Sequence, residues 1–252
     1  MKTKFIDYFH DGPIFITGHL NPDGDALGSA FALKIFFESQ NISSDVNFDI
    51  TTKLPSNLNH LPYHLISNDI KDKYNTVFVF DCGNSSRLGK YEEVVLAAEN
   101  IVVIDHHVDP SFGDVQIIDP EAASTTQVLF RQFKDENIEI NEEMSNCLLT
   151  GLITDTGRFQ YSNTTSEVFS IAAELLSKGA NLSQISENIY GSIEFNALTL
   201  QSKIIERIVL DEDLQFAHSI VFQNDYKDYQ VEPEETDFLI DVVRLVKEST
   251  VA

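Results

Sequence analysis

Histidine and aspartate side chains that could bind metal ions stand in four short segments of the sequence, each after an apolar run or a helical stretch. Imidazole and carboxylate groups together suit Mn²⁺, Fe²⁺, Co²⁺ or Zn²⁺, and the lack of a thiolate set disfavours a structural zinc site. The sequence therefore predicts a site for divalent cations. The candidate ligands are His19, Asp23 and Asp25 in the first segment, Asp81 in the second, His106 in the third and Asp155 in the fourth.

The charge of these residues favours two cations over one. Asp23, Asp25, Asp81 and Asp155 carry four negative charges, which two divalent ions would balance. Two such ions, typically about 3.5–4 Å apart, lower the pKa of a bound water and hold a phosphoryl group for in-line attack. Without cations, clustered carboxylates would be costly and their pKa values would rise. The chemistry expected from these residues is therefore attack of water on a phosphoryl group.

Each segment also has an ordinary structural interpretation. An Asp-x-Asp pair before a helix is often only an N-cap. An aspartate at a strand end is often a cap or turn residue, and most His-His pairs bind no metal. The occurrence of all four segments within the first 155 residues favours the metal interpretation.

The elements that must position these residues alternate between strands and helices. This order is typical of an α/β fold with a parallel sheet and flanking helices. Ligands bind outside the carboxyl ends of the strands in such sheets, and the first three segments lie there. Strands are predicted at Pro13–Gly18, Thr76–Asp81, Asn100–Asp105 and Val115–Asp119, and helices at Ala26–Ser39, Tyr91–Ala98, Ser124–Phe133, Glu142–Thr154 and Ser166–Lys178.

The pattern changes near residue 190, where we expect a domain boundary. A first domain, 1–190, would hold the metal site and end in a linker helix over about 181–195. The remainder, 196–252, would form part of a smaller α+β domain. Its predicted elements are two hairpin strands, Glu206–Leu210 and Leu214–Phe222, a turn at Asp211–Asp213 and a helix at Pro233–Lys247.

Composition excludes several classes of protein. The 252 residues are 42% hydrophobic, which suffices for a core, and no run of 18 or more apolar residues could span a membrane. A formal net charge of −23 argues against a broad basic surface that tracks long nucleic acid. Cys82 and Cys147 follow no disulfide or zinc spacing, and as buried free thiols they favour a reducing, cytoplasmic setting.

At these segments the chain resembles the DHH phosphoesterase superfamily, named for the triplet that stands here as Asp105-His106-His107. The branch with similar motifs contains bifunctional oligoribonucleases (nanoRNases), which degrade short RNA and often hydrolyse the 3′-phosphate of pAp. The resemblance implies a two-metal phosphodiesterase or phosphatase. It covers about residues 10–195 and is carried by GHLNPDGDALGS (Gly18–Ser29), DCGNSSRLG (Asp81–Gly89), VVIDHH (Val102–His107) and GLITDTGRFQYSNTT (Gly151–Thr165).

The resemblance also implies how two divalent cations would be held. Mn²⁺ is the first choice, with Mg²⁺, Co²⁺ or Fe²⁺ as alternatives. Asp81 would bridge the two ions. One ion would be held by His19, Asp23 and Asp81, and the other by Asp25, Asp81, His106 and Asp155.

Three residues are the catalytic candidates under the same resemblance: Asp81, Asp105 and His107. Asp105 is similar to a residue that orients a neighbouring imidazole. His107 is similar to a histidine that faces the phosphate and could protonate the leaving oxygen. Ser124–Thr126 and Arg158 are weaker candidates for substrate contact, since Ser124 could equally cap a helix and Arg158 could equally form a surface salt bridge.

The C-terminal part departs from the family pattern. Family members usually continue into a DHH-associated domain whose Gly-Gly-Gly-His loop clamps the far end of the substrate. The last glycine here is Gly191, and the sequence from about Phe195 resembles only the opening half of that domain. We therefore expect a fragment or a shortened member that ends at Ala252.

Three functions remain open at this stage. The leading one is hydrolysis of short single-stranded RNA to 5′-mononucleotides, or of the 3′-phosphate of pAp. We expect such an enzyme not to be bound to a membrane, and it could form a homodimer. A second is hydrolysis of pyrophosphate or a cyclic dinucleotide. The acidic C-terminal segment disfavours pyrophosphate, since pyrophosphatases of similar fold use a Lys/Arg-rich clamp there. The third is a metal-binding regulatory protein that lacks its substrate clamp, against which the intact ligand set argues.

Overall fold

The computed structural model describes residues 5–9, 12–51, 53–108, 111–191, 193–233, 236 and 238–251. The chain divides into two compact units, Met1–Asn188 and Ile189–Ala252. The assignment of a catalytic and a substrate-binding domain to these parts of the chain stays a prediction.

The first unit is built around a parallel sheet of five strands in the order β2-β1-β3-β4-β5. The predicted α/β class is confirmed, and so are the four predicted strands. The edge strand β2 was not predicted, because its three residues carry no apolar run. The strands are β1 (Ile14–Gly18), β2 (Ser44–Val46), β3 (Thr76–Phe80), β4 (Asn100–Asp105) and β5 (Val115–Ile118).

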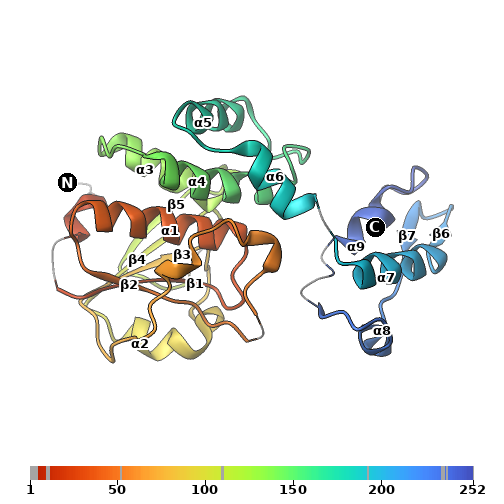
Figure 1. The fold of residues 1–252 in the computed structure, drawn as a ribbon, viewed down its shortest axis with the longest axis horizontal. Coiled ribbons are helices and arrows are strands. Elements are labelled where there is room, and N and C mark those ends of the chain that lie inside the picture. The colour runs from red at the N-terminus through yellow and green to blue at the C-terminus, as the bar shows by residue number, and fades with distance from the viewer. Residues whose placement is uncertain are drawn as a thin grey trace. The chain divides into compact units, whose positions relative to one another are not determined.

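Helices cover both faces of this sheet (Figure 1). On one face lie α1 (Gly24–Ser39), α3 (Thr125–Asp135) and α4 (Glu142–Asp155), and on the other lies α2 (Glu92–Leu96). Two further helices, α5 (Ser166–Ser177) and α6 (Leu182–Tyr190), follow α4 along the chain. Every residue of β1 and β3 is buried, as expected for strands that are covered from both sides.

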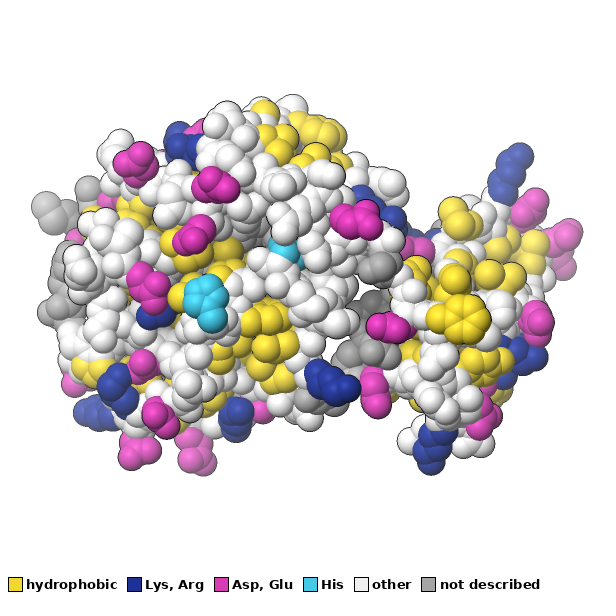
Figure 2. Space-filling view, viewed as in Figure 1, with side chains coloured by type: hydrophobic (Ala, Val, Ile, Leu, Met, Phe, Trp, Pro, Cys, Tyr) yellow, Lys and Arg dark blue, Asp and Glu magenta, His cyan; other side chains and the backbone are white. Residues whose placement is uncertain are grey.

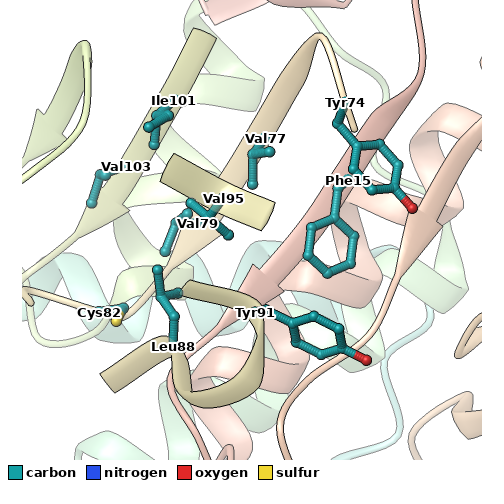
Figure 3. Close-up of a cluster of buried hydrophobic side chains, with 10 residues drawn as sticks. All are labelled: Phe15, Tyr74, Val77, Val79, Cys82, Leu88, Tyr91, Val95, Ile101 and Val103. Atoms are coloured by element: carbon teal, nitrogen blue, oxygen red, sulfur yellow. The ribbon is translucent and has the colours of Figure 1, made fainter. Parts of the chain in front are cut away.

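Alternate residues of the strands build two hydrophobic layers. On one face, the Phe78 ring meets Phe5, Phe9 and Phe37 at centroid distances of 5.5, 6.0 and 5.8 Å. The hydrophobic layer on the other face of the sheet lies on the side of α2 and of the short 3₁₀ helix η4 (Ser85–Tyr91), as Figure 3 shows. Its buried members are Phe15, Tyr74, Val77, Val79, Cys82, Leu88, Tyr91, Val95, Ile101 and Val103.

Close packing of α1 against α4 depends on glycine. A Cβ atom at Gly28 would lie 2.4 Å from the carbonyl oxygen of Cys147. A Cβ atom at Gly151 would lie 2.6 Å from Oδ1 of Asp25. The two glycines therefore allow the backbone of α4 to approach the first turns of α1, which carry candidate metal ligands.

Gly28→Ala tests this packing. In an unconstrained helix interior this change would stabilise the protein by about 1 kcal/mol. Here the added methyl group overlaps a backbone carbonyl, so we expect the free energy of unfolding to fall by about 1–3 kcal/mol. Urea denaturation of the variant and the wild type measures the difference. A variant at least as stable as the wild type would mean that α1 and α4 are further apart than described.

The second unit contains short elements and corrects several sequence predictions. The predicted strand Glu206–Leu210 is helical at its start, and strand pairing begins only at Val209. The predicted strand Leu214–Phe222 is reduced to three residues. The helix predicted at Pro233–Lys247 is α-helical only over Leu239–Arg244 among the described residues, and residues 245–247 are not helical; residues 234, 235 and 237 lie outside the described part. The elements are α7 (Phe195–Glu206), β6 (Val209–Asp211), β7 (Phe216–His218), α8 (Gln223–Tyr229) and α9 (Leu239–Arg244).

The two cysteines, Cys82 and Cys147, are free and buried, as predicted. Within the described residues, no helix combines the length and apolar character needed to cross a membrane. On the described surface visible in Figure 2, Lys and Arg side chains stand singly among Asp and Glu side chains and form no continuous basic stripe.

Candidate metal centre

Three neighbouring strands place candidate residues at the same edge of the sheet. His19 follows β1, Asp81 follows β3, and Asp105 ends β4. Because the strands are parallel and in register, their carboxyl ends meet side by side. Asp81 has φ +54°, in the left-handed region, and its N–H donates to the carbonyl of Ile104 on β4. This backbone bend turns the Asp81 side chain away from the strand direction and toward its neighbours.

The start of α1 contributes two carboxylates with different surroundings. Asp23 is the N-cap, and its Oδ1 accepts from the N–H groups of Asp25 and Ala26 at 3.0 and 3.1 Å. Asp25 is fully buried. Its two oxygens accept from the N–H groups of Thr125 at 2.5 Å and Thr126 at 2.8 Å, at the start of α3. The positive end of α3 therefore stabilises this buried charge.

The structure brings the predicted ligands together in three overlapping groups. Within each group, the potential ligand atoms lie within 4.8 Å of one another. Asp155, at the end of α4, joins the residues from the strand ends. The groups are His19, Asp23 and Asp81; Asp25, His106 and Asp155; and Asp81, Asp105, His106 and His107.

Asp81 stands between two sets of these residues. Its Oδ2 lies 3.5 Å from Nε2 of His19, while its Oδ1 lies 3.7 Å from Nε2 of His106 and 3.3 Å from Nδ1 of His107. On the His19 side, Nε2 is also 3.8 Å from Oδ1 of Asp23. The two oxygens of one carboxylate thus face two different groups of potential ligands.

The two histidines that face Asp81 with Nε2 are oriented by backbone carbonyls. Nδ1 of His19 lies 2.8 Å from the carbonyl oxygen of Leu20, and Nδ1 of His106 lies 3.3 Å from that of Ala122. A proton on each Nδ1 would donate to these carbonyls and leave Nε2 with a free lone pair. In its neutral form, each ring would therefore present a lone pair to the carboxylate cluster.

The pKa shifts indicate that the cluster has an excess of negative charge. Burial, followed by the charges of Asp155, Asp81 and Asp23, raises the pKa of Asp25 well above its usual value. Burial also raises the pKa of Asp155 to about 6, with Asp23 and Asp81 adding to the shift and His106 opposing it. Without another positive charge, these carboxyl groups bind protons more tightly than a free aspartate does.

The pKa values of two histidines are raised as well, because the nearby carboxylates favour the charged imidazole. Burial by itself lowers the pKa of His19, but the carboxylates of Asp23 and Asp81 outweigh it and raise the value to about 10. The same balance of burial against the carboxylate of Asp155 raises the pKa of His106. Against the effect of burial, the imidazoles of His107 and His19 hold the pKa of Asp81 below its usual range. Protons thus occupy the positions between carboxylates and imidazoles.

The residues present fit divalent cations. Nε2 of His106 is buried and makes no hydrogen bond within the described part of the chain, and it lies 3.3 Å from Oδ2 of Asp155. A buried polar atom without a partner is costly in a protein interior. A cation bound between these ligands would satisfy Nε2 and replace the protons that the cluster otherwise retains. The donor set of imidazole nitrogens and carboxylate oxygens is the chemistry that such ions require.

Asp105 and His107 form a separate pair beside this cluster. Asp105 is fully buried, and its Oδ1 accepts from the N–H groups of His106 and His107 and from Nδ1 of His107 at 2.7, 3.0 and 2.8 Å. Hydrogen bonds to Asp105 and Asp81 raise the pKa of His107 to about 10. The His107 side chain is half exposed, so its Nε2 edge faces away from these two carboxylates.

The two weaker sequence candidates differ in placement. Ser124 is fully buried, and its hydroxyl caps α3 by accepting from the N–H of Gln127, which accounts for this residue without a substrate. Arg158 is exposed and follows α4 in a turn where Gly157, Arg158 and Phe159 all have positive φ. This turn starts two residues after Asp155, so Arg158 lies near the cluster along the chain.

Two residues make contacts at the site that the sequence did not predict: Thr125, which was only a weak candidate for substrate contact, and Asn163, which was not a candidate. The Thr125 hydroxyl donates to Oδ1 of Asp81 at 3.3 Å. The Asn163 side chain donates to the carbonyls of Asp155 at 3.0 Å and Ala123 at 3.3 Å, and so ties the end of α4 to the start of α3. Asn163 lies in the Gly151–Thr165 motif and Thr125 in the candidate segment Ser124–Thr126, but the sequence pattern does not reveal which atoms they contact.

Comparison with known proteins agrees with this fold. The model of the DHH family, N-terminal domain, matches residues 13–152. The bifunctional oligoribonuclease and PAP phosphatase NrnA of Thermus thermophilus is 34% identical over 188 residues, which are 71% of this chain and 54% of that protein. The probable bifunctional oligoribonuclease and PAP phosphatase NrnA of Streptococcus mutans is 28% identical over 233 residues, or 90% of this chain and 72% of that protein. The chain thus spans about half the length of the Thermus relative.

Solved structures show the same architecture. An exopolyphosphatase-related protein from Bacteroides fragilis has a TM-score of 0.87 and 25% sequence identity, and the match covers 97% of this chain and 76% of that one. A putative family II inorganic pyrophosphatase from Methanococcus jannaschii, at 21% identity and a TM-score of 0.53 over 77% of this chain and 64% of that one, shares the fold. The family match covers more than half of the 252 residues, from the first strand into α4. This chain belongs to the DHH family.

Proposed function

We propose that this chain is a two-metal phosphoesterase that hydrolyses very short RNA to 5′-mononucleotides, or removes the 3′-phosphate of pAp. The observation that carries the proposal is the position of Asp81, whose two oxygens face His19 on one side and His106 on the other. A carboxylate in this position can bridge two cations. The substrate class comes from the names of the relatives in Thermus and Streptococcus.

The geometry around Asp81 supports the two ligand sets that we propose. Bound divalent cations would supply an activated water and a positive clamp for the phosphoryl group. Mn²⁺ is our proposed ion, since the donors are imidazole nitrogens and carboxylate oxygens without thiolates. His19, Asp23 and Asp81 would hold one ion, and Asp25, Asp81, His106 and Asp155 the other.

His107 would handle the proton and the phosphate. Its Nδ1 donates to the buried Asp105, so the exposed Nε2 edge carries the second proton when the ring is charged. A pKa raised to about 10 keeps that proton in place at neutral pH. Nε2–H can then donate to a phosphate oxygen and pass its proton to the leaving oxygen.

The part of the protein that holds the substrate is proposed to begin in the second unit.

A substrate panel tests the proposal. Purified protein with Mn²⁺ is incubated separately with pAp, a 5′-labelled RNA dinucleotide, pyrophosphate and cyclic di-AMP. We expect release of AMP from pAp and of mononucleotides from the dinucleotide, and loss of both activities with EDTA. Turnover of pyrophosphate or cyclic di-AMP alone would overturn the substrate class. Metal binding without turnover of any substrate would favour a regulatory protein.

Asp105→Asn should separate the role of His107 from metal binding. Asn at this position can still accept through Oδ1, but it removes the negative charge that keeps His107 protonated. We expect kcat to fall by about 10-fold to 100-fold, with Mn²⁺ affinity changed by less than about threefold. The alkaline limb of the pH–rate profile should move to lower pH, because the pKa of His107 falls. An unchanged pH profile would contradict the role given to His107.

A further inference from the structure

A single residue of α3 contacts two of the carboxylates in the metal centre. The Thr125 N–H donates to Oδ2 of Asp25 at 2.5 Å, and the Thr125 hydroxyl donates to Oδ1 of Asp81 at 3.3 Å. Asp25 comes from the start of α1, and Asp81 from the end of β3. Thr125 is thus the point at which three elements of the fold meet around the proposed ligands.

The surroundings of Thr125 leave it little freedom. It is fully buried, and it is the first residue of α3, whose N-cap Ser124 accepts from the N–H of Gln127. Thr126 adds a second backbone donor to Asp25 at 2.8 Å. Gly151 of α4 packs closely against this turn: a Cβ atom added to Gly151 would lie 2.5 Å from the methyl group of Thr126. The first turn of α3 therefore has no space to move toward α4. The start of α3 is therefore a rigid support for donors.

The orientation of Asp81 needs such a support. Its backbone is in the left-handed region, and its side chain is surrounded by acceptors and by histidines that can change protonation. The Thr125 hydroxyl is a donor that does not titrate, and β-branching restricts its rotamers. It can hold Oδ1 in one direction whether or not the neighbouring imidazoles carry protons.

We propose that Thr125 is a positioning residue of the metal centre, which sets the direction of the Asp81 carboxylate relative to Asp25. This inference rests on the proposed function in one respect only, namely that Asp25 and Asp81 bind cations. Thr125 itself touches neither cation nor substrate in this proposal. Its backbone N–H and its hydroxyl act on different ligands, so the two contributions can be separated by mutation.

Thr125→Val removes the hydroxyl and keeps the branched shape and the N–H bond to Asp25. We expect Mn²⁺ affinity, measured by calorimetry on the metal-free protein, to fall by about 10-fold to 100-fold, the effect typical of residues that support metal ligands. Thr125→Ser keeps the hydroxyl and should stay within about threefold of the wild type. Circular dichroism and thermal unfolding in EDTA show whether each variant is folded.

The matched control is Thr76→Val on β3, the strand that leads to Asp81. Thr76 is fully buried, and its hydroxyl has no hydrogen-bond partner among the described residues, so the same change should leave Mn²⁺ affinity unaltered.

Wild-type Mn²⁺ affinity in Thr125→Val would overturn the proposal, and so would equal loss of affinity in Thr125→Val and Thr125→Ser. If Thr125→Val does not fold, Thr125→Ala takes its place with the same threshold. Because the readout is binding, it remains decisive even if none of the substrates is hydrolysed.

Discussion

Asp81→Asn should abolish hydrolysis while leaving the fold intact. Asp81 is the only carboxylate, among the described residues, whose two oxygens face both His19 and His106. Removing one group that stabilises charge in a reaction costs about 10²–10³ in kcat, and a ligand shared by two cations should lie at the upper end. We therefore expect kcat/KM for pAp or an RNA dinucleotide to fall by about 10³-fold, or about 4 kcal/mol in the barrier.

Asparagine is the appropriate replacement because of the backbone at this position. Asp81 has φ +54°, and asparagine is among the few residues that tolerate the left-handed region. The amide is also close in shape to the carboxylate, so the buried site need not repack. A larger structural change, such as alanine, would mix loss of the ligand with strain and a cavity.

Steady-state kinetics in Mn²⁺, together with a titration of bound Mn²⁺ per protein, measures the effect. Asp69→Asn is the control, since Asp69 is exposed in a loop of the same unit and should retain full activity. Asp81→Asn activity within threefold of the wild type would refute the bridging role. Loss of activity with full, undiminished Mn²⁺ binding would refute it as well.

The sequence predicted the centre because its residues follow strands that are easy to recognise. β1, β3 and β4 are runs of buried apolar residues, and His19, Asp81 and Asp105 stand at their carboxyl ends. Parallel strands bring these ends together, so no three-dimensional information was needed to group the residues. Asp155 was included through its motif, and the end of α4 places its carboxylate near His106.

The same reasoning could not assign individual contacts. Asp105 was predicted to orient a neighbouring imidazole, but the sequence cannot say that its bond goes to His107 while His106 bonds the carbonyl of Ala122. Thr125 is one of three adjacent hydroxyl residues, and which of them reaches Asp81 depends on the angle at which α3 meets the sheet. Such details follow from packing between distant elements.

The second unit was predicted less well for a physical reason. Its two strands have three residues each, and α8 and α9 are short, so few periods of any hydrophobic pattern are present. The helix α7 was missed because no element was predicted for residues 196–205, between the expected linker helix and the expected hairpin. Short elements take their conformation from contacts such as the pair of Arg207 with Asp225, which the sequence does not reveal.

Asp155→Asn should make the metal-free protein more stable and the enzyme much less active. Burial, with the charges of Asp23 and Asp81, raises the pKa of Asp155 from 3.8 to about 6. A carboxylate whose pKa is raised by folding destabilises the folded state once pH exceeds its value in the unfolded chain. The penalty grows as pH rises from about 4 to about 6 and is constant above that range.

The amide carries no charge and escapes this penalty. In EDTA at pH 7.5 we expect Asp155→Asn to be more stable than the wild type by roughly 1–3 kcal/mol, from about 1.4 kcal/mol per pKa unit. The gain should vanish below about pH 4, where the wild-type carboxyl is protonated as well. With Mn²⁺ the order should reverse, because binding stabilises the protein that holds the ion more tightly. Activity should fall by about 10²-fold or more.

Thermal unfolding of both proteins in EDTA and in Mn²⁺, at pH 4 and pH 7.5, tests all of these signs in one set of measurements. Asp69→Asn removes an exposed carboxylate and should change neither stability nor its dependence on pH. If Asp155→Asn is less stable than the wild type in EDTA at pH 7.5, the repulsion attributed to the cluster is absent. If the order does not reverse in Mn²⁺, Asp155 is not a ligand. Opposite signs in the two conditions would mean that this carboxylate destabilises the fold and is retained for the cation it binds.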